Sequence, residues 1–499
     1  MYTWVLLVVA VVLCAYLLLW LYEARARVLL RDTPHFPTLP FIGNMHQLFG
    51  DGQLLYNRLV ELSNIMEDTA KPFVIWVGSY PLIVVSDPED VKAVTNTFIE
   101  KPYFYNFGRV WLGDGLVTAP GAIWKRSIKK LSNTFTSSIV DGYQEIFNEQ
   151  AQKLVTKLKQ EVGQKPFDAM EKYLALTTLE VICQTALGVP QISDSIVTVE
   201  YYQAFNKTLE LLLSRGLNLF YHSDIIYRFT PAYKELRRCV AVLHNVSETI
   251  MKRRKIEMEE LRRKQETKTE LEISKNKFKP FIDILLGLSE MDNSLTDAWV
   301  KSEVDTIIVG GQETVATTLF YALLMIGSKP RIQNLLVAEM KEIFADSNRP
   351  VVKDDLVRMR YTEAVIQETL RLYPPVPGVM RYADKDLPLR TCTIPKGTAC
   401  CVNAFGAGRS TRLWGEDASE YRPERWLEGP LEHPAAFLAF SYGRRSCIGR
   451  RYAITLLKTI LAYSVRELVI ESEADHLKFK IDIALKPVSG HLMTVKLRN

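Results

Sequence analysis

The 499-residue sequence contains few cysteines, little net charge and no glycine-rich dinucleotide motif, and each absence excludes a class of protein. No two cysteines form a C-x-x-C pair, which excludes the usual zinc and dithiol redox sites and favours a reducing compartment. The net charge of +5 is too small to indicate a nucleic-acid partner. Because no G-x-G-x-x-G motif occurs, the chain has no recognisable dinucleotide site of its own. The seven cysteines are Cys14, Cys183, Cys239, Cys392, Cys400, Cys401 and Cys447.

The first 23 residues are predicted to form a membrane anchor. No charged side chain occurs between Trp4 and Tyr22, and a helical run of about twenty apolar residues spans roughly 30 Å of hydrocarbon. The alternative is a cleaved signal peptide, because Ala24-Arg25-Ala26 resembles a small-residue cleavage site. The basic region that begins such a peptide is missing and the apolar run is long, so a retained anchor is the favoured interpretation.

Positive charge follows the anchor, while only the terminal amine precedes it. Arg25, Arg27 and Arg31 are expected to hold the downstream side in the cytosol. We therefore expect a single-pass protein of the endoplasmic reticulum membrane with a cytosolic body. Two glycosylation sequons, which begin at Asn206 and Asn245, would carry glycans only if this orientation were wrong.

The remainder divides into a hinge and one large body, although composition alone leaves the domain count open. Pro34, Pro37 and Pro40 favour an extended, stiff segment between membrane and body. The predicted segments are an anchor at 1–23, a basic and proline-rich hinge at 24–44 and a globular body at 45–499.

The body is predicted to be mainly α-helical with one small β region, because helical periodicity dominates and strand signals are sparse. Residues Phe73–Val85, interrupted by Gly78-Ser79-Tyr80-Pro81, have the pattern of a β-hairpin. Between Lys252 and Lys279 the sequence is dense in charges of both signs, which is typical of a solvated helix and loop.

One cysteine lies in an unusual setting. Residues 440–449 read FSYGRRSCIG and fit the pattern F-x-x-G-x-R-x-C-x-G, which is too specific for a chance match. Gly443 and Gly449 permit a tight turn and the close approach of a flat ring to the backbone. A helix that begins after Cys447 would place its positive end near the sulfur. The ordinary alternative is a small buried cysteine on a turn.

The other fixed positions of this pattern suit a haem whose iron is bound by the thiolate of Cys447. Phe440 can shield the sulfur from water, backbone N–H groups can point toward it, and Arg445 supplies a cation for a haem propionate. A thiolate ligand pushes electron density onto iron and favours cleavage of the O–O bond. The expected chemistry is therefore oxygen insertion, with Cys447 as the metal ligand.

The chain resembles the cytochrome P450 family from the anchor and proline hinge to the C-terminal loop. The resemblance implies that fold, with residues 45–499 as the haem-thiolate catalytic domain. Glu368-Thr369-Leu370-Arg371 matches the family's E-x-x-R helix, which Pro374-Pro375 would end, and residues 421–426, YRPERW, resemble its later P-E-R-F element. By resemblance, Glu368, Arg371 and Arg425 form a structural charge triad. Taken alone, an E-x-x-R pair is more often a surface ion pair.

Residues 310–314, GGQET, resemble the oxygen-activation segment on the family's long central helix. The resemblance implies that Glu313 and Thr314 deliver protons. Oxygen needs two protons at its distal atom, and a hydroxyl linked to a titratable acid can supply them. As an isolated pattern, the same residues would more often form a flexible helix or loop.

A nearby segment indicates a branch of the family. Ser302-Glu303-Val304-Asp305-Thr306 is similar to a segment of the fatty-acid-hydroxylating branch and its insect relatives. In that branch a glutamate often stands at the position of Gly310 and can form a covalent ester with the haem. The resemblance therefore implies haem b held here without an ester bond.

The residues that would bind the haem propionates depart from the family in one place. The resemblance implies Trp124 and Arg381 as propionate ligands, but the basic residue expected four positions after the tryptophan is Ile128. Arg126 or Lys129 is a candidate to compensate.

The basic run of Lys125, Arg126, Lys129 and Lys130 has two interpretations. It forms either a docking surface for an acidic reductase or an ordinary solvated helix face. Two further departures from the family, Val315 and Gly408, remove no catalytic group.

The expected function is insertion of one atom of O2 into a lipophilic substrate such as a fatty acid, terpenoid, hormone or xenobiotic. Electrons would come from NADPH through a separate NADPH–cytochrome P450 reductase, with cytochrome b5 as a candidate second donor. The apolar segments Leu209–Leu213 and Leu217–Tyr221 either line an access channel or are ordinary helix core.

Two other functions stay open. One is a haem-thiolate isomerase or dehydratase of oxygenated lipids, and the other is a non-catalytic haem or lipid carrier. Neither needs the pair Glu313-Thr314, whose presence favours the monooxygenase.

Overall fold

The computed structural model describes residues 24–189, 199–265, 279–292, 294–345 and 347–498, together with six positions of the first 23 residues. The predicted anchor therefore lies largely outside the described residues, as do residues 266–278 of the mixed-charge region. The six described positions are helical and exposed; they are Trp4, Leu7, Ala10, Leu13, Cys14 and Leu17.

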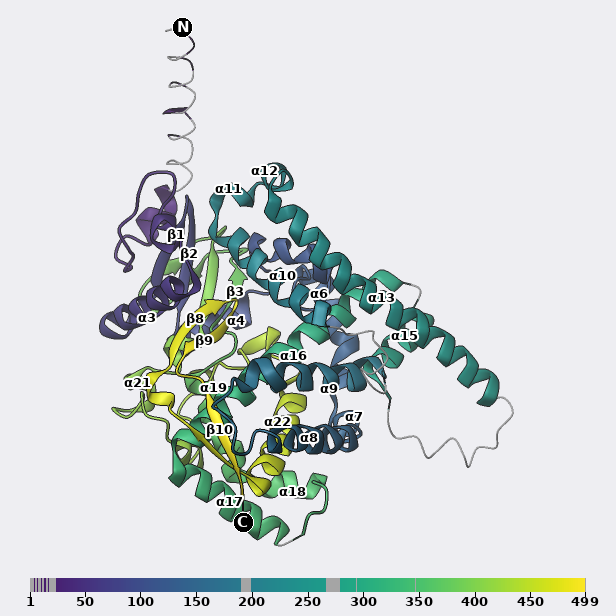
Figure 1. Cartoon of the computed structure of the whole chain (residues 1–499). Coiled ribbons are helices and arrows are strands. Elements are labelled where there is room, and N and C mark those ends of the chain that lie inside the picture. The colour runs from purple at the N-terminus through teal and green to yellow at the C-terminus, as the bar shows by residue number, and fades with distance from the viewer. Residues whose placement is uncertain are drawn as a thin grey trace.

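The described chain is mainly helical, as predicted, and Figure 1 shows the helices packed into one body beside a smaller group of strands. The helices are α2 (Met45–Leu48), α3 (Gly52–Thr69), α4 (Pro88–Thr97), α5 (Arg109–Leu112), α6 (Gly121–Leu131), α7 (Ser137–Asp141), α8 (Gln144–Lys159), α9 (Ala175–Leu187), α10 (Val199–Leu217), α11 (Leu219–His222), α12 (Asp224–Arg228), α13 (Pro231–Gln265), α15 (Phe281–Met291), α16 (Asp297–Ser328), α17 (Pro330–Phe344), α18 (Lys353–Arg358), α19 (Arg360–Leu372), α20 (Ala404–Ala407), α21 (Thr411–Trp414) and α22 (Arg450–Glu467).

Helix α16 runs through the middle of the helical part (Figure 1). Thr296 caps its first turn by accepting a hydrogen bond from the Trp299 N–H at 3.3 Å, as threonine does at helix N-termini. The helix packs against α9, α13, α15, α17, α19 and α22. Among the described residues it is the helix long and apolar enough to cross a membrane, but it lies mostly buried inside the protein, as a core helix does.

The strands form one four-stranded sheet and three two-stranded ladders. In the larger sheet the order is β1 (Phe73–Val77), β2 (Tyr80–Val85), β6 (Ala399–Asn403) and β3 (Gly378–Tyr382). Only the β2–β6 pair is parallel. The ladders pair β4 (Leu387–Pro388) with β5 (Thr393–Ile394), β7 (Leu468–Ser472) with β10 (Met493–Leu497), and β8 (Lys478–Asp482) with β9 (Ala484–Ser489).

The predicted hairpin at Phe73–Val85 is confirmed as β1 and β2, but its turn is tighter than expected. Only Gly78 and Ser79 connect the strands, and Pro81 lies within β2 opposite Trp76. In this antiparallel hairpin the pair after Val77 and Tyr80 is Trp76 and Pro81, and such a pair exchanges no hydrogen bonds. The missing N–H of Pro81 therefore breaks no hydrogen bond between the two strands. The predicted helix end before Pro374 is also confirmed, since α19 ends at Leu372.

The predicted hinge is attached to the sheet rather than free of it. The Val74 N–H donates to the Pro34 carbonyl at 2.8 Å. Asn44, which is fully buried, accepts from the Trp76 N–H at 2.7 Å and donates to the Phe36 carbonyl at 2.9 Å. The second half of the hinge therefore covers the edge of β1.

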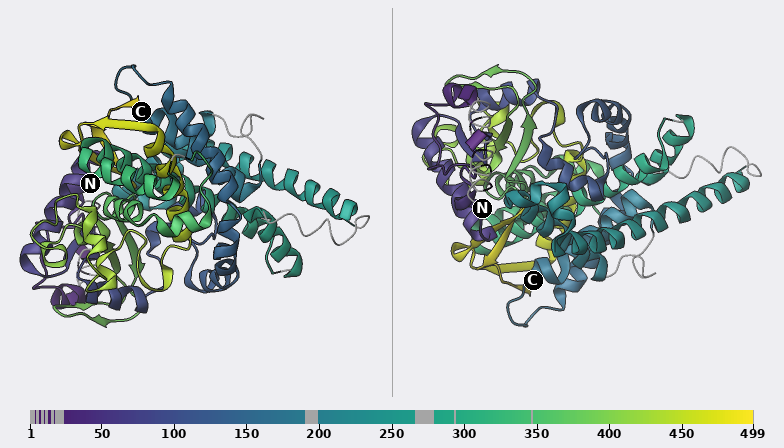
Figure 2. Two further views of the ribbon diagram at one scale, coloured as in Figure 1. Left: turned by 90° about the horizontal axis from the view of Figure 1, so that it is seen from below. Right: turned by 90° about the horizontal axis from the view of Figure 1, so that it is seen from above.

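The hydrophobic core of the described residues consists of one large cluster and several smaller ones. The large cluster surrounds α16 and joins the helices, while two smaller clusters cover the faces of the four-stranded sheet. Figure 2 shows α13 and α15 extending on the side away from the β1–β3 region. The loop that contains Cys447 precedes α22, which packs on α16.

Candidate functional site

The loop before α22 presents the Cys447 sulfur to backbone donors. The Cys447 N–H donates to the Phe440 carbonyl at 2.8 Å, which closes the loop. Burial by surrounding atoms raises the pKa of the Cys447 thiol, whereas the N–H groups of Gly449 and Arg450 at the start of α22 act in the opposite direction. The side chain is nevertheless accessible to solvent. The sulfur thus lies accessible before α22, in a field that suits a thiolate bound to a metal cation.

Gly443 is required in this loop for two reasons. Its φ of +72° lies in the left-handed region, and a Cβ there would lie 2.8 Å from Thr95 Oγ1 and 2.9 Å from Asn96 Oδ1. Any side chain would strain the backbone and push the loop away from α4. The glycine therefore fixes the distance between the cysteine loop and α4.

Helix α16 carries a narrow accessible stripe although its surroundings are core. Ile307, Gly310, Gly311 and Thr314 are accessible or partly accessible, at the i, i+3, i+4 and i+7 spacing of one helix face. A Cβ on Gly310 would meet no atom within 4 Å. From this open face on a central helix we infer an internal hollow above it.

Three cations gather near the cysteine loop without an acidic partner. Arg381 on β3 is 1% exposed, and its Nε and Nη2 are buried without a hydrogen-bond partner. Arg445 likewise has Nε and Nη1 unpartnered, while its Nη2 donates to the Ala119 carbonyl at 2.7 Å. Lys101 Nζ lies 4.1 Å from the centre of the Tyr105 ring. No carboxylate in the described parts of the chain forms an ion pair with any of the three.

The charges of this cluster repel one another. Burial lowers the pKa of Lys101 well below its usual value, and the guanidinium groups of Arg381 and Arg445 lower it further. Burial, with Arg381 as the next cause, also lowers the pKa of Arg445 to about 10, and the charge of Glu100 offsets this only in part. A buried group of like charges is stable only with a counter-ion. The Lys101–Arg381–Arg445 cluster is therefore built for an anion.

The other predicted propionate residues divide between this cluster and the surface. Trp124 is buried on α6, and the Arg445 guanidinium lies 4.8 Å from its ring centre. Ile128 packs in a small apolar cluster with Trp124. Arg126 and Lys129, the expected substitutes, are exposed. Lys101, which the sequence interpretation missed, lies in the cluster with Arg381 and Arg445 instead.

Glu313 and Thr314 lie on neighbouring faces of α16. The Thr314 hydroxyl belongs to the accessible stripe and donates to the Gly310 carbonyl at 2.6 Å. Glu313 is 7% exposed and forms an ion pair with Lys486 of β9 at 3.3 Å. Only the threonine therefore reaches the hollow directly.

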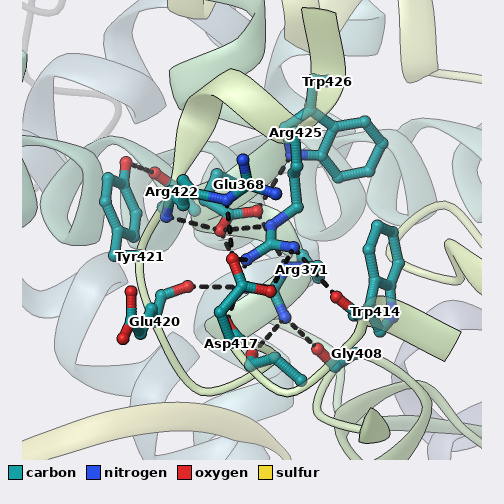
Figure 3. Close-up of polar contacts among 12 residues, drawn as sticks. Glu368, Arg371, Gly408, Trp414, Asp417, Glu420, Tyr421, Arg422, Arg425 and Trp426 are labelled. Atoms are coloured by element: carbon teal, nitrogen blue, oxygen red, sulfur yellow. Dashed lines mark hydrogen bonds and ion pairs between the residues drawn. The ribbon is translucent and has the colours of Figure 1, made fainter. Parts of the chain in front are cut away.

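Glu368, Arg371 and Arg425 are brought together in a buried network (Figure 3). Arg371 donates to both Glu368 oxygens at 2.8 Å, and Arg425 Nε donates to Glu368 Oε1 at 3.1 Å. Arg371 also donates to the carbonyls of Gly408 and Ala418. The network joins α19 to the segment around residues 408–426 and is paired on all sides, unlike an exposed E-x-x-R pair.

The same network explains one departure from the family. A Cβ on Gly408 would lie 2.2 Å from the Arg371 carbonyl oxygen. The larger residue that is common in the family has no room here unless the backbone shifts. Glycine is thus tied to the close packing of this loop on α19.

The cysteine loop, the open face of α16 and the cationic cluster fit one flat, anionic, metal-bearing group. The sulfur supplies a metal ligand, Gly310 leaves room for a ring, and the unpartnered guanidinium groups match carboxylates. A haem has these three properties.

Comparisons with known proteins agree with this site. The Cytochrome P450 family model matches residues 34–492. Cytochrome P450 4c21 of Blattella germanica is 33% identical over 96% of this chain and 95% of its own length. Human cytochrome P450 4V2 is 30% identical over 92% of this chain and 88% of its own length, and cytochrome P450 4c3 of Drosophila melanogaster is 28% identical over 94% and 90%.

The fold and site define a haem-thiolate oxygenase. The chain belongs to the cytochrome P450 family and is a monooxygenase of that family. The predicted branch is confirmed, since the similar relatives include cytochromes P450 4 of insects and human. Membership implies haem, O2, a redox partner that supplies electrons, and a lipophilic substrate.

Proposed function

We propose that this chain is a membrane-anchored monooxygenase that inserts one oxygen atom into a lipid-soluble substrate, with Cys447 as the axial ligand of haem b. The observation that carries the proposal is the accessible Cys447 sulfur, toward which the N–H groups of Gly449 and Arg450 are directed, beside an open α16. Haem supplies the iron at which O2 is activated. Phe440 closes the loop through its carbonyl and shields the sulfur.

The propionates are proposed to bind Lys101, Arg381 and Arg445 beside Trp124. Two carboxylates would neutralise most of the charge of the cluster and occupy the guanidinium nitrogens that lack partners. Since Gly310 has no side chain to esterify, the haem is held without a covalent ester. Acidified organic extraction should therefore remove all haem from the denatured chain; retained haem would contradict this.

Thr314 is proposed to hold and pass protons at the open face of α16, with Glu313 as the acid behind it. A positioned hydroxyl linked to an acid is the arrangement that proton delivery needs. Thr314→Ala should leave the haem spectrum unchanged and raise peroxide formed per NADPH several-fold, measured with reductase. Thr314→Ser, which keeps the hydroxyl, is the control. Unchanged peroxide yield in the alanine variant would remove this role.

Electrons are proposed to come from NADPH through a separate reductase that docks on the basic face of α6. Lys125, Arg126 and Lys129 are exposed there, while Lys130 is paired with Asp292 at 2.7 Å. Lys125→Glu/Arg126→Glu should weaken reductase binding and increase its salt sensitivity. Cytochrome b5 would compete for the same face.

Membrane attachment through residues 1–23 remains a proposal, and exposed apolar side chains support it. Phe220, Ile225 and Phe229 on and near α11 and α12 are each at least 75% exposed. Figure 1 shows α11 and α12 at the end of the molecule from which the described hinge begins. The Asn206 amide is engaged with Lys486 and Tyr202, which suits a sequon that carries no glycan and a cytosolic body.

The isomerase and carrier functions are separated from the monooxygenase by one assay. The full-length protein in vesicles is supplied with reductase, NADPH and dodecanoate as a probe. Oxygenated product with NADPH consumption supports the monooxygenase. Haem bound without any NADPH-dependent turnover of O2, to product, water or peroxide, would favour a carrier or an isomerase.

A further inference from the structure

Glu313 is separated from the hollow by its position on α16. It precedes Thr314, so it points about 100° away around the helix. It is 7% exposed, and its Oε1 lies 3.3 Å from Nζ of Lys486. The carboxylate is thus directed toward β9 and α10 rather than along the accessible stripe.

The structure holds Lys486 firmly in this place. The residue before it, Leu485, accepts from the Tyr321 hydroxyl of α16 at 3.2 Å and donates to the Pro375 carbonyl at 3.1 Å. These bonds fix β9 against α16. Lys486 is half-buried, so its ammonium is only partly screened by water.

Lys486 also contacts the helix on the other side of the pair. Its Nζ donates to Asn206 Oδ1 of α10 at 3.4 Å, and Asn206 Nδ2 donates to the Tyr202 carbonyl at 3.2 Å. One ammonium therefore connects Glu313 of α16 with α10.

The other charged groups near Glu313 cannot replace Lys486. Glu313 faces Tyr202, whose pKa is raised mainly by burial and further by the charge of Glu313. Asp168 and Glu171 lie beyond that tyrosine and are acidic, and Asp168 pairs with His491 at 3.3 Å. Among the described residues, Lys486 is the one cation within 4 Å of the Glu313 carboxylate.

We propose that Lys486 is a positioning residue for proton delivery. Its ammonium holds the Glu313 carboxylate toward α10, and its hydrogen bond to Asn206 makes the geometry of the Lys486–Glu313 pair depend on the position of α10. The inference rests on the proposed role of Glu313. Lys486 itself transfers no proton; it fixes the group that does. Removal of the ammonium leaves the buried carboxylate without its ion pair and free to rotate.

The test compares Lys486→Met with Lys486→Arg and with Lys480→Met in the full-length holoenzyme with reductase. Lys480 lies directly opposite on β8 and pairs with Asp482 at 2.7 Å, so it controls for loss of a cation from the same hairpin. Peroxide formed per NADPH is measured between roughly pH 6 and 9, with and without dodecanoate. The carbon monoxide difference spectrum reports whether each variant is folded.

Lys486→Met should raise the peroxide yield several-fold across this pH range, because the carboxylate of Glu313 is no longer held in place. Lys486→Arg and Lys480→Met should behave like the unchanged protein. If Lys486→Met and Lys480→Met give the same profile, or if Lys486→Arg is as defective as methionine, the inference is overturned. Only the loss of the ammonium that pairs with Glu313, in an intact hairpin, predicts the first pattern.

Glu313→Gln separates this inference from the function on which it rests. If Glu313→Gln leaves peroxide yield unchanged, the proton role of Glu313 fails. If Glu313→Gln is defective and Lys486→Met is not, only the positioning role fails. The double variant should be no worse than Glu313→Gln alone, because both changes remove one function.

Discussion

Two groups of buried arginines in this protein differ in what neutralises them. Around Glu368, the guanidinium groups of Arg371 and Arg425 bond to the carboxylates of Glu368 and Asp417 and to several backbone carbonyls. Around Arg381 and Arg445, four guanidinium nitrogens have no partner and the nearest cations repel. The first group is complete within the chain, whereas the second is complete only with an anion from outside.

The contrast separates stability from cofactor binding. A buried ion network that pairs every charge holds elements together, and loss of one member leaves uncompensated charge. A buried cluster of charges of one sign instead lowers the free energy of unfolding of the protein without its ligand. Binding of the counter-ion neutralises the cluster and raises that free energy again. The two groups should therefore respond to mutation in different ways.

The largest effect is expected for Glu368→Gln. This change leaves buried Arg371 without a carboxylate and Arg425 with Asp417 alone, at a cost of about 3–5 kcal/mol, a large part of the stability of about 5–15 kcal/mol of a typical domain. We expect loss of most folded holoprotein, measured by thermal unfolding and haem content. Glu428→Gln, which breaks an exposed pair with Arg422, should change little. Equal midpoints for the two variants would contradict the account.

Arg381→Met should weaken haem retention without unfolding the chain. The variant removes a cation that no protein group neutralises, so the fold loses little while the propionates lose a partner. Haem transfer to apomyoglobin should be several-fold faster, with unchanged circular dichroism. Arg371→Met should instead reduce the helical signal. A similar loss of structure in both variants would erase the distinction between the two groups.

Lys101→Met should produce a smaller increase in haem loss, and Ile128→Arg should reverse part of it. Ile128 stands where the family places a base and packs beside Trp124, so an arginine there can reach the same anion. Lys125→Met, on the exposed face of α6, is the matched control. Failure of Ile128→Arg to slow haem loss in the Lys101→Met background would show that the two positions serve different groups.

The smallest effect concerns Glu303, a buried acid that is the converse of the cationic cluster. Burial raises its pKa to about 7, although the Leu116 N–H donates to it at 3.0 Å. The folded state then keeps its proton to higher pH than the unfolded state, so stability falls as pH rises from about 4.5 to 7 and is level above. Glu303→Gln should therefore raise the thermal midpoint more at pH 8 than at pH 5. Glu210→Gln, on the surface, should show no such difference.

The sequence was enough to predict features that depend on local order. The cysteine loop, the end of α19 before Pro374 and the β1–β2 hairpin each follow from turn residues and spacing along a short segment. The meeting of Glu368 with Arg425 was expected only through the resemblance to the family. Motifs with fixed spacing carried these predictions.

The parts that could not be predicted depend on contacts between distant segments. Lys101 and Lys486 lie outside any motif, and each matters because burial and neighbouring charges surround it. The prolines of the hinge predicted an extended spacer but not the contact in which the Val74 N–H at the sheet edge donates to the Pro34 carbonyl. A one-dimensional pattern shows which residues are charged but not which charges are left without partners.

The most direct test of the account is the carbon monoxide difference spectrum of the reduced full-length protein beside Cys447→Ala. The account predicts a Soret band at the long wavelength typical of thiolate ligation, and its loss in the variant. Cys401→Ala, at a cysteine of the four-stranded sheet, should keep the band. The absence of haem in the unchanged protein, or the same band in Cys447→Ala, would contradict the assignment of the ligand and the chemistry that depends on it.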